Sequence, residues 1–219
     1  MTAEPTGFLY PFIDSEERDA AGLLDDLAAS ARSKVAISRE VRVESIRRCG
    51  ETLREAGGEM ARGFARGGRL FAFGNGGSAT DAEGAVDLFR RPPRGRPLPA
   101  VSLVDDKAVI TALSNDVGFE LVFSRQIIAH ARPGDMALGF STSGGSFNVL
   151  RAFEEASSRG LLTIGFSGYE GGAMAASRHV RYCLVVRSDS VHRIQESQEA
   201  IMFALWGEVQ ERLGQEGGR

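Results

Sequence analysis

The sequence predicts an α/β fold, a three-layer αβα sandwich on a five-stranded parallel sheet, with a helical extension at the N-terminus. Beyond residue 68, short apolar runs alternate regularly with segments of helical periodicity. Uninterrupted apolar strands of this kind are typical of a parallel sheet that helices cover on both faces. Two of the runs lead directly into loops of glycine and serine, as expected at the carboxyl ends of parallel strands, where such sheets bind ligands.

Residues 1–13 contain two prolines and scattered aromatic residues. We expect an arm that either packs against a neighbouring subunit or frays. Helical periodicity then continues to about Gly68 and predicts two helices joined near residues 33–38. Residues 14–213 are predicted to form a single domain, followed by a flexible tail at 214–219.

The remaining elements alternate between strand and helix. Strands are predicted near residues 69–73, 98–103, 135–140, 161–166 and 180–186. Helices are predicted near residues 79–90, 106–114, 119–131, 146–159 and 190–213. The proline-rich stretch 92–97 is interpreted as a stiff turn before the second strand and not as a domain linker.

The composition is that of an ordinary globular chain of 219 residues, of which 42% are apolar and 25% charged, enough for one substantial core. A net charge of −3 gives no reason to expect direct binding to nucleic acid or a membrane. No apolar run approaches the roughly 20 residues of a membrane span, and the N-terminus lacks a signal-peptide pattern. We therefore expect a cytoplasmic protein.

The chain has two cysteines. Cys49 falls in a predicted helix and Cys183 in a predicted buried strand, a placement that favours two reduced core thiols over a disulfide. The sequence contains no spacing typical of zinc ligands.

The first glycine-rich loop, Gly74–Ser78, lies between a predicted strand and a predicted helix. This arrangement offers free backbone N–H groups and the positive end of a helix dipole to an anion. Its G-x-G-x-x-A spacing also matches the dinucleotide fingerprint, but the next strand does not end on an acidic residue at the expected distance. A tight turn, with Asp81 and Glu83 compensating the dipole, is a further interpretation of this loop. A Walker-type phosphate loop is excluded because neither glycine-rich loop contains lysine.

The second loop carries four hydroxyl groups in six residues, on Ser141, Thr142, Ser143 and Ser146. All four can be directed at one anion, while the two glycines between them allow the backbone to approach closely. Capping of the following helix would explain Ser146 alone. The loop therefore predicts a cradle for the phosphate of a hydroxyl-rich ligand.

Five motifs of the chain, taken in order, resemble those of a known family. They are Gly74-Asn75-Gly76-Gly77-Ser78, Ser114-Asn115-Asp116-Val117-Gly118-Phe119, Ser141-Thr142-Ser143-Gly144-Gly145-Ser146-Phe147-Asn148-Val149, Ser167-Gly168-Tyr169-Glu170-Gly171-Gly172 and Arg193-Ile194-Gln195-Glu196. The family is that of the bacterial phosphoheptose isomerases, in the sugar isomerase (SIS) domain superfamily. The resemblance extends from about residue 40 to 213. It implies the SIS fold, a homotetramer with active sites at subunit interfaces, and conversion of sedoheptulose 7-phosphate to a heptose 7-phosphate.

The resemblance also implies roles for individual residues. Its phosphate ligands fall on Ser78, Ser141, Thr142, Ser143 and Ser146. Its contacts to the sugar or to a metal fall on Asn75, Asp116 and Gln195.

The chain departs from the family at the residues that perform chemistry. By resemblance, a His and a Glu that serve the zinc site fall on Gly84 and Leu88, and a Gln and a His fall on Gln195 and Phe203. Leu and Phe neither hold a metal nor carry a proton. We therefore expect no zinc and no other cofactor.

His192 and Glu199 are the candidates for a replacement acid–base pair, which an aldose–ketose isomerase needs to move a proton between adjacent carbons. Glu199 follows Gln195 by four residues and so faces the same side of a helix. His192 titrates near neutrality unless it is perturbed. In the alternative interpretation both are surface residues. Asp87 is expected to pair with Arg91 rather than to enter the site.

The leading hypothesis is a SIS protein that binds a phosphorylated sugar as a homo-oligomer and has lost the isomerase site, so that it senses the ligand or binds a protein partner. One branch that resembles this family, the replication-initiator-associating proteins, similarly lacks part of the acid–base set. The alternative is an active isomerase on sedoheptulose 7-phosphate or a related phosphosugar, using His192 and Glu199 without zinc. A nucleotide-binding domain is the third hypothesis.

Overall fold

The structure, a computed structural model, describes residues 20–216. The chain divides into two units, residues 1–37 and residues 38–219. The first unit contributes the beginning of helix α1 (Ala20–Ala65), and the second contains the rest of that helix and every other element. The arm predicted at residues 1–13 lies outside the described part of the chain.

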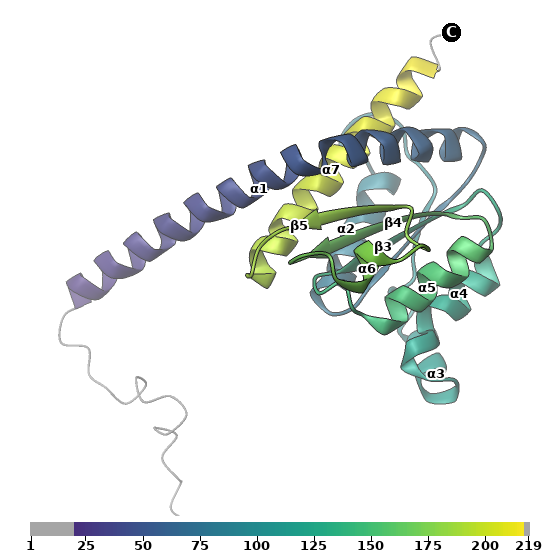
Figure 1. Ribbon diagram of the computed structural model, residues 1–219, viewed down its shortest axis with the longest axis horizontal. Coiled ribbons are helices and arrows are strands. Elements are labelled where there is room, and N and C mark those ends of the chain that lie inside the picture. The colour runs from purple at the N-terminus through teal and green to yellow at the C-terminus, as the bar shows by residue number, and fades with distance from the viewer. Residues whose placement is uncertain (1–19, 217–219) are drawn as a thin grey trace, which may run out of the picture. The chain divides into compact units, whose positions relative to one another are not determined.

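The second unit is built around five parallel strands in the order β2-β1-β3-β4-β5 (Figure 1). The strands are β1 (Leu70–Gly74), β2 (Ala100–Ser102), β3 (Met136–Ser141), β4 (Leu162–Gly168) and β5 (Tyr182–Val186). β1 and β3 are buried along their whole length, as expected of strands covered on both faces. The predicted parallel sheet is therefore confirmed.

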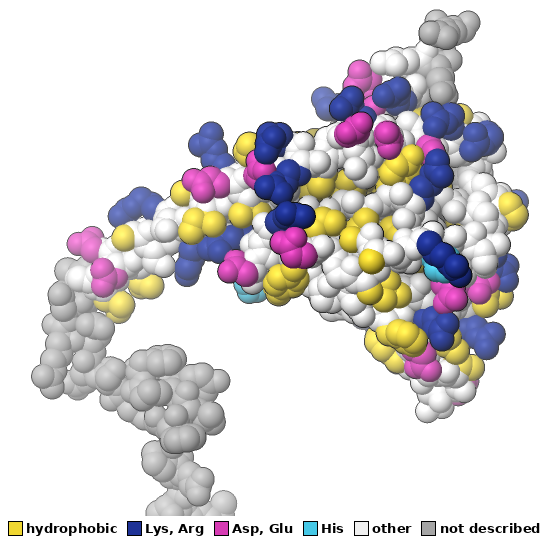
Figure 2. Space-filling model, viewed as in Figure 1, with side chains coloured by type: hydrophobic (Ala, Val, Ile, Leu, Met, Phe, Trp, Pro, Cys, Tyr) yellow, Lys and Arg dark blue, Asp and Glu magenta, His cyan; other side chains and the backbone are white. Residues whose placement is uncertain are grey.

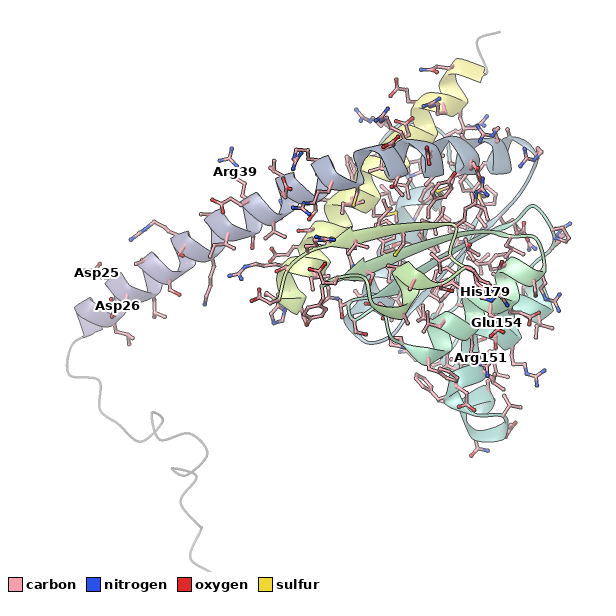
Figure 3. The ribbon with its side chains drawn as sticks, viewed as in Figure 1. Asp25, Asp26, Arg39, Arg151, Glu154 and His179 are labelled. Carbon is pink, nitrogen blue, oxygen red and sulfur yellow. The ribbon has the colours of Figure 1, made fainter. Side chains whose placement is uncertain are left out.

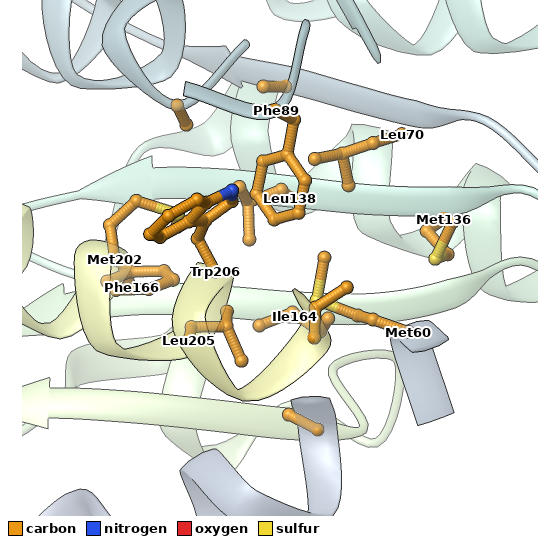
Figure 4. Close-up of a cluster of buried hydrophobic side chains, with 14 of the residues drawn as sticks. Met60, Leu70, Phe89, Met136, Leu138, Ile164, Phe166, Met202, Leu205 and Trp206 are labelled. Carbon is orange, nitrogen blue, oxygen red and sulfur yellow. The ribbon is translucent and has the colours of Figure 1, made fainter. Parts of the chain in front are cut away.

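Helices form the two outer layers. They are α2 (Gly77–Arg90), α3 (Lys107–Asp116), the 3-10 helix η2 (Phe119–Leu121), α4 (Val122–His130), α5 (Phe147–Ser158), α6 (Gly172–Ala176) and α7 (Val191–Glu216). One core cluster lies between the sheet and helices α1, α2 and α7, where Trp206 and Phe89 are fully buried (Figure 4). A second cluster, with Phe73 packed against Phe123 and Phe153, fills the opposite face beneath α4 and α5. These two clusters make the three layers.

The prediction of two N-terminal helices is wrong, because α1 runs without interruption from Ala20 to Ala65. Residues 31–40 contain neither glycine nor proline, the residues that most strongly end a helix. A run of polar residues interrupts the apolar pattern at this point, but it does not interrupt the backbone.

Two local elements also differ from the sequence prediction. The helix predicted at 119–131 begins as the 3-10 turn η2 after Gly118, whose φ of 102° is outside the helical region. The five-residue helix α6 was not predicted. It starts after Gly171, which has a φ of 97°, and it is too short to show a helical period.

Both cysteines are free thiols, as the sequence predicts. Cys49 is buried on α1, and Cys183 is half-buried on β5. Burial raises the pKa of the Cys183 thiol to about 12 and raises that of Cys49 as well.

Basic and acidic side chains are interspersed on the face shown in Figure 2. Some form local pairs, such as Arg151 with Glu154 on the outer side of α5, where the two groups are 2.9 Å apart (Figure 3). Among residues 20–216, none of the helices combines the length and the apolar character needed to cross a bilayer.

Candidate functional site

The two glycine-rich loops lie side by side at the carboxyl edge of the sheet. β1 and β3 are neighbouring parallel strands, and Gly74 at the end of β1 pairs in register with Phe140 near the end of β3. The loops that follow the two strands therefore start next to one another.

A reciprocal pair of amide hydrogen bonds ties the first loop to helix α5. Asn75 Nδ2 donates to Asn148 Oδ1 at 2.8 Å, and Asn148 Nδ2 donates to Asn75 Oδ1 at 2.9 Å. Asn148 is buried, and its Oδ1 also accepts from the backbone N–H of Val149. Both side chains are thus oriented by each other.

The second loop gathers its hydroxyl groups into a cluster. Ser141 Oγ lies 2.9 Å from Ser146 Oγ and 3.4 Å from Ser143 Oγ. Ser141 is buried at the end of β3, whereas Ser143 is exposed, so the cluster extends from the sheet edge to the surface. Ser146 occupies the N-cap position of α5 but its side chain makes no capping hydrogen bond. Capping therefore does not explain this hydroxyl group.

A third loop, after β4, packs tightly against the second. Gly144 has a φ of 64°, and a Cβ placed there would lie 2.1 Å from the carbonyl oxygen of Gly171. The backbone N–H of Met174 donates to the Gly144 carbonyl at 2.8 Å. Position 144 therefore requires glycine for both its conformation and its space.

Ser78 and Gln195 join the same region from two different helices. Ser78 is buried in the first turn of α2, and its backbone N–H donates to the Asn75 carbonyl at 3.0 Å. Gln195 on α7 lies against the first loop, because a Cβ on Gly77 would fall 2.3 Å from Gln195 Nε2. The structure thus brings the predicted residues Asn75, Ser78 and Gln195 together around the first loop.

Asp116 is placed differently from the other predicted contacts. It is exposed at the end of α3, where its carboxylate accepts a hydrogen bond from Asn115 Nδ2. No hydrogen bond within residues 20–216 connects it to the serine cluster, and its role stays a prediction from the resemblance.

A cavity of about 1120 Å³ opens between α2 and α7. Phe140, which immediately precedes Ser141 on β3, forms part of its wall, whereas Ser141, Ser143 and Ser146 do not line it. The wall also includes Arg42, Ile46, Asp81, Leu88, Glu199 and Phe203. The volume is in the range of pockets that hold small molecules.

Asp81 is a residue of this cavity that the sequence alone did not single out as a site residue. Gln195 Nε2 donates a hydrogen bond to Asp81 Oδ2 at 3.2 Å. Burial raises the pKa of the Asp81 carboxyl to about 6, with the hydrogen bond from Gln195 opposing the shift and the charge of Glu199 adding to it. A carboxyl group tuned toward neutrality in a cavity is typical of a functional site. The signal in the sequence was its helical spacing from Gly84 and Leu88, which puts all three on one face of α2.

The side chains of this cavity do not fit a zinc site. Gly84, Leu88 and Phe203 line it at three positions where the resemblance places zinc-site residues, and only Gln195 of that set offers a donor atom. In the described part of the chain, no three His, Cys, Asp or Glu side chains are grouped so that they could hold a metal ion.

The structure does not join His192 to Glu199. Seven residues separate them on α7, which corresponds to roughly 10 Å along the helix axis. Both side chains are exposed, and of the two only Glu199 lines the cavity. Asp87 pairs with Arg91 at 2.6 Å, as the sequence predicts, but both residues also line the cavity, so the expectation that Asp87 stays out of the site is wrong.

Comparison with known proteins agrees with this geometry. The family model described as SIS domain matches residues 37–168. A phosphoheptose isomerase of Roseiflexus sp. is 44% identical over 157 residues, which cover 70% of this chain and 78% of that protein. A phosphoheptose isomerase of Aquifex aeolicus is 39% identical over 80% of this chain and 92% of its own length.

A solved structure gives the same result for the fold. The phosphoheptose isomerase of Neisseria gonorrhoeae superimposes with a TM-score of 0.78 at 32% identity, covering 84% of this chain and 99% of that one. The chain therefore belongs to the SIS-domain family, within the group formed by the phosphoheptose isomerases.

Proposed function

We propose that the chain binds a phosphorylated sugar, with the phosphate at the serine cluster and the carbohydrate end in the cavity between α2 and α7. The observation that carries this proposal is the convergence of the Ser141, Ser143 and Ser146 hydroxyl groups at the N-terminus of α5. Hydroxyl groups and a helix N-terminus together suit a phosphate group. The relationship to phosphoheptose isomerases supports a sugar phosphate such as sedoheptulose 7-phosphate as the ligand.

Calorimetric titration with sedoheptulose 7-phosphate tests this proposal. The double variant Ser143→Ala with Ser146→Ala is expected to weaken binding about tenfold or more. It removes two protein hydroxyl groups that would hydrogen-bond the charged phosphate of the ligand. The matched control is Ser157→Ala with Ser158→Ala at the far end of α5, which is expected to bind as the wild type does. Absence of binding of any phosphosugar to the wild type would refute the proposal.

Zinc is not part of the proposed site. Glycine, leucine and phenylalanine, which offer no metal-binding atom, stand at three of the four positions that the resemblance assigns to the zinc site. Metal analysis of the purified chain is expected to find zinc well below one ion per chain. Stoichiometric zinc that survives dialysis would contradict this expectation.

The absence of the zinc-site side chains supports the first candidate role. In this role the protein senses a ligand or binds a protein partner and does not catalyse isomerisation. The second candidate is a metal-free isomerase, and the raised pKa of Asp81 favours it because proton transfer needs a group that titrates near the working pH. Asp81 and Glu199 line one cavity. They form a better-placed acid–base pair than His192 and Glu199.

Deuterium incorporation separates the two roles. The protein is incubated with sedoheptulose 7-phosphate in deuterated water, and the recovered sugar is analysed by mass spectrometry. The sensor role predicts no incorporation above the protein-free control. Deuterium on the carbon next to the carbonyl would establish proton abstraction and select the isomerase.

The same relationship supports a homotetramer and a cytoplasmic location as parts of this proposal. A protein partner is a further part of the sensor role.

A further inference from the structure

Asp81 lines the cavity and is linked to the first glycine-rich loop through Gln195. It lies three residues after Ser78 on α2, and its Oδ2 atom accepts a hydrogen bond from Gln195 Nε2. Gln195 is itself held against Gly77 in the first loop. The carboxyl group is therefore positioned relative to the first loop by a side chain from α7.

The wall of the cavity that Asp81 lines combines apolar side chains with charged ones, among them Arg42, Arg91 and Glu199. Leu88 from α2 and Phe203 from α7 line the cavity with Ile46 of α1. Asp81 itself is half-buried in this cavity.

One oxygen of this carboxyl group is left without a protein partner. Gln195 hydrogen-bonds Oδ2, and no residue between 20 and 216 donates to Oδ1. This oxygen keeps access to solvent, so it can accept a hydrogen bond from water or from a ligand hydroxyl group. Glu199 provides a second carboxyl group in the same cavity.

We propose that Asp81 recognises the carbohydrate end of the bound phosphosugar by hydrogen-bonding the hydroxyl groups next to its carbonyl. This assignment rests on the proposed function and adds a specificity-determining residue to it. A site built to bind a hydroxyl group discriminates strongly against ligands that lack it. The ligand class is therefore polyhydroxylated sugar phosphates, and inorganic phosphate would engage only the serine cluster.

The test compares two ligands on three variants by calorimetric titration. Asp81→Ala is expected to weaken the binding of sedoheptulose 7-phosphate about tenfold or more. The affinity for inorganic phosphate is expected to change by less than about twofold. Asp81→Asn keeps the shape and part of the hydrogen-bonding capacity and is expected to show a smaller loss. The control is Glu83→Gln, two residues further on α2, exposed and outside the cavity wall, which is expected to leave both ligands unaffected.

An equal loss for both ligands in Asp81→Ala would overturn the assignment, because it would mean that Asp81 shapes the phosphate loop. Unchanged binding of sedoheptulose 7-phosphate would also overturn it, while leaving the proposed function intact. If the wild type bound neither ligand, the proposed function would fail and the assignment with it.

A measurement on the unmodified chain avoids any question of variant folding. The carboxyl carbon of Asp81 is followed by nuclear magnetic resonance during both titrations. Sedoheptulose 7-phosphate is expected to shift this resonance, and inorganic phosphate is expected to leave it in place. A resonance that moves with neither ligand, or with both alike, would count against the assignment.

Discussion

A carboxyl group whose pKa is raised by burial holds its proton more tightly in the folded chain than in the unfolded one, and Asp81 is such a group. Its pKa rises from 3.8 to about 6. Its contribution to stability is complete below pH 3.8 and is lost as the pH rises through about 6, because the folded state then binds more protons than the unfolded state. At neutral pH the ionised carboxylate therefore lowers the free energy of unfolding.

The variant Asp81→Asn is expected to be more stable than the wild type above pH 7. Removing the charge should raise the free energy of unfolding by about 1–2 kcal/mol at pH 7.5, and by little at pH 4. Urea unfolding at both pH values measures the difference. A variant no more stable than the wild type at pH 7.5 would show that the carboxylate is better solvated than its position indicates. Glu83→Gln is the control.

The side-chain amide groups of Asn75 and Asn148 hydrogen-bond each other. If the role of Asn75 is to make these hydrogen bonds with Asn148, the variants Asn75→Ala and Asn148→Ala should each weaken the binding of inorganic phosphate and of sedoheptulose 7-phosphate to the same extent. The double variant should be no weaker than either single variant, because one shared interaction is lost. A direct sugar contact by Asn75, as the resemblance implies, would instead give additive losses limited to the sugar phosphate.

At the scale of the element, the centre of β3 is packed without spare room. A Cβ at Gly139 would lie 2.6 Å from Phe153 and 2.8 Å from Phe73. Gly139→Ala is therefore expected to lower the free energy of unfolding by about 1–3 kcal/mol through overpacking. In α7, a Cβ at Gly207 meets nothing within 4 Å, and Gly207→Ala should raise stability by about 0.5–1 kcal/mol. Urea unfolding measures both, and equal effects would refute the packing argument.

Elements with a strong local signal were predictable from the sequence. The apolar runs that became β1 and β3 were recognisable because strands buried on both faces need continuous apolar residues. The join near residues 33–38 was mispredicted because a polar interruption does not break a helix that has no glycine or proline there. The helix α6 has too few residues to carry a period.

The serine cluster was predictable for a similar reason, since its hydroxyl groups are consecutive in the sequence. Asp81 was not, because its surroundings come from distant segments. Gln195 on α7 gives it a hydrogen-bond partner, and only the folded chain brings α7 beside α2. The same holds for the pairing of Asn75 with Asn148.

At the scale of the molecule, apolar side chains remain exposed on α1. Leu24 is 66% exposed and Val35 is 69% exposed, and some of the yellow side chains in Figure 2 lie along this helix. Exposed apolar surface of this kind is typical of a protein interface. It agrees with the homotetramer that we propose.

Light scattering tests the assembly. The wild type is expected to have about four times the 23.5 kDa mass of one chain. Leu24→Asp with Val35→Asp is expected to lower this mass, because charges would be placed on an apolar contact surface. Arg39→Asp, an exposed substitution on the same helix, serves as the control. A wild type with the mass of a single chain would refute the tetramer.

The two native thiols have a practical consequence. With a pKa near 12, Cys183 stays protonated at pH 7.5, and Cys49 is buried with a raised pKa. Alkylating dyes react with the thiolate, so neither cysteine should react with maleimides in the folded chain. A single cysteine introduced at exposed Ser158 would then carry a fluorophore selectively, without prior removal of the native pair.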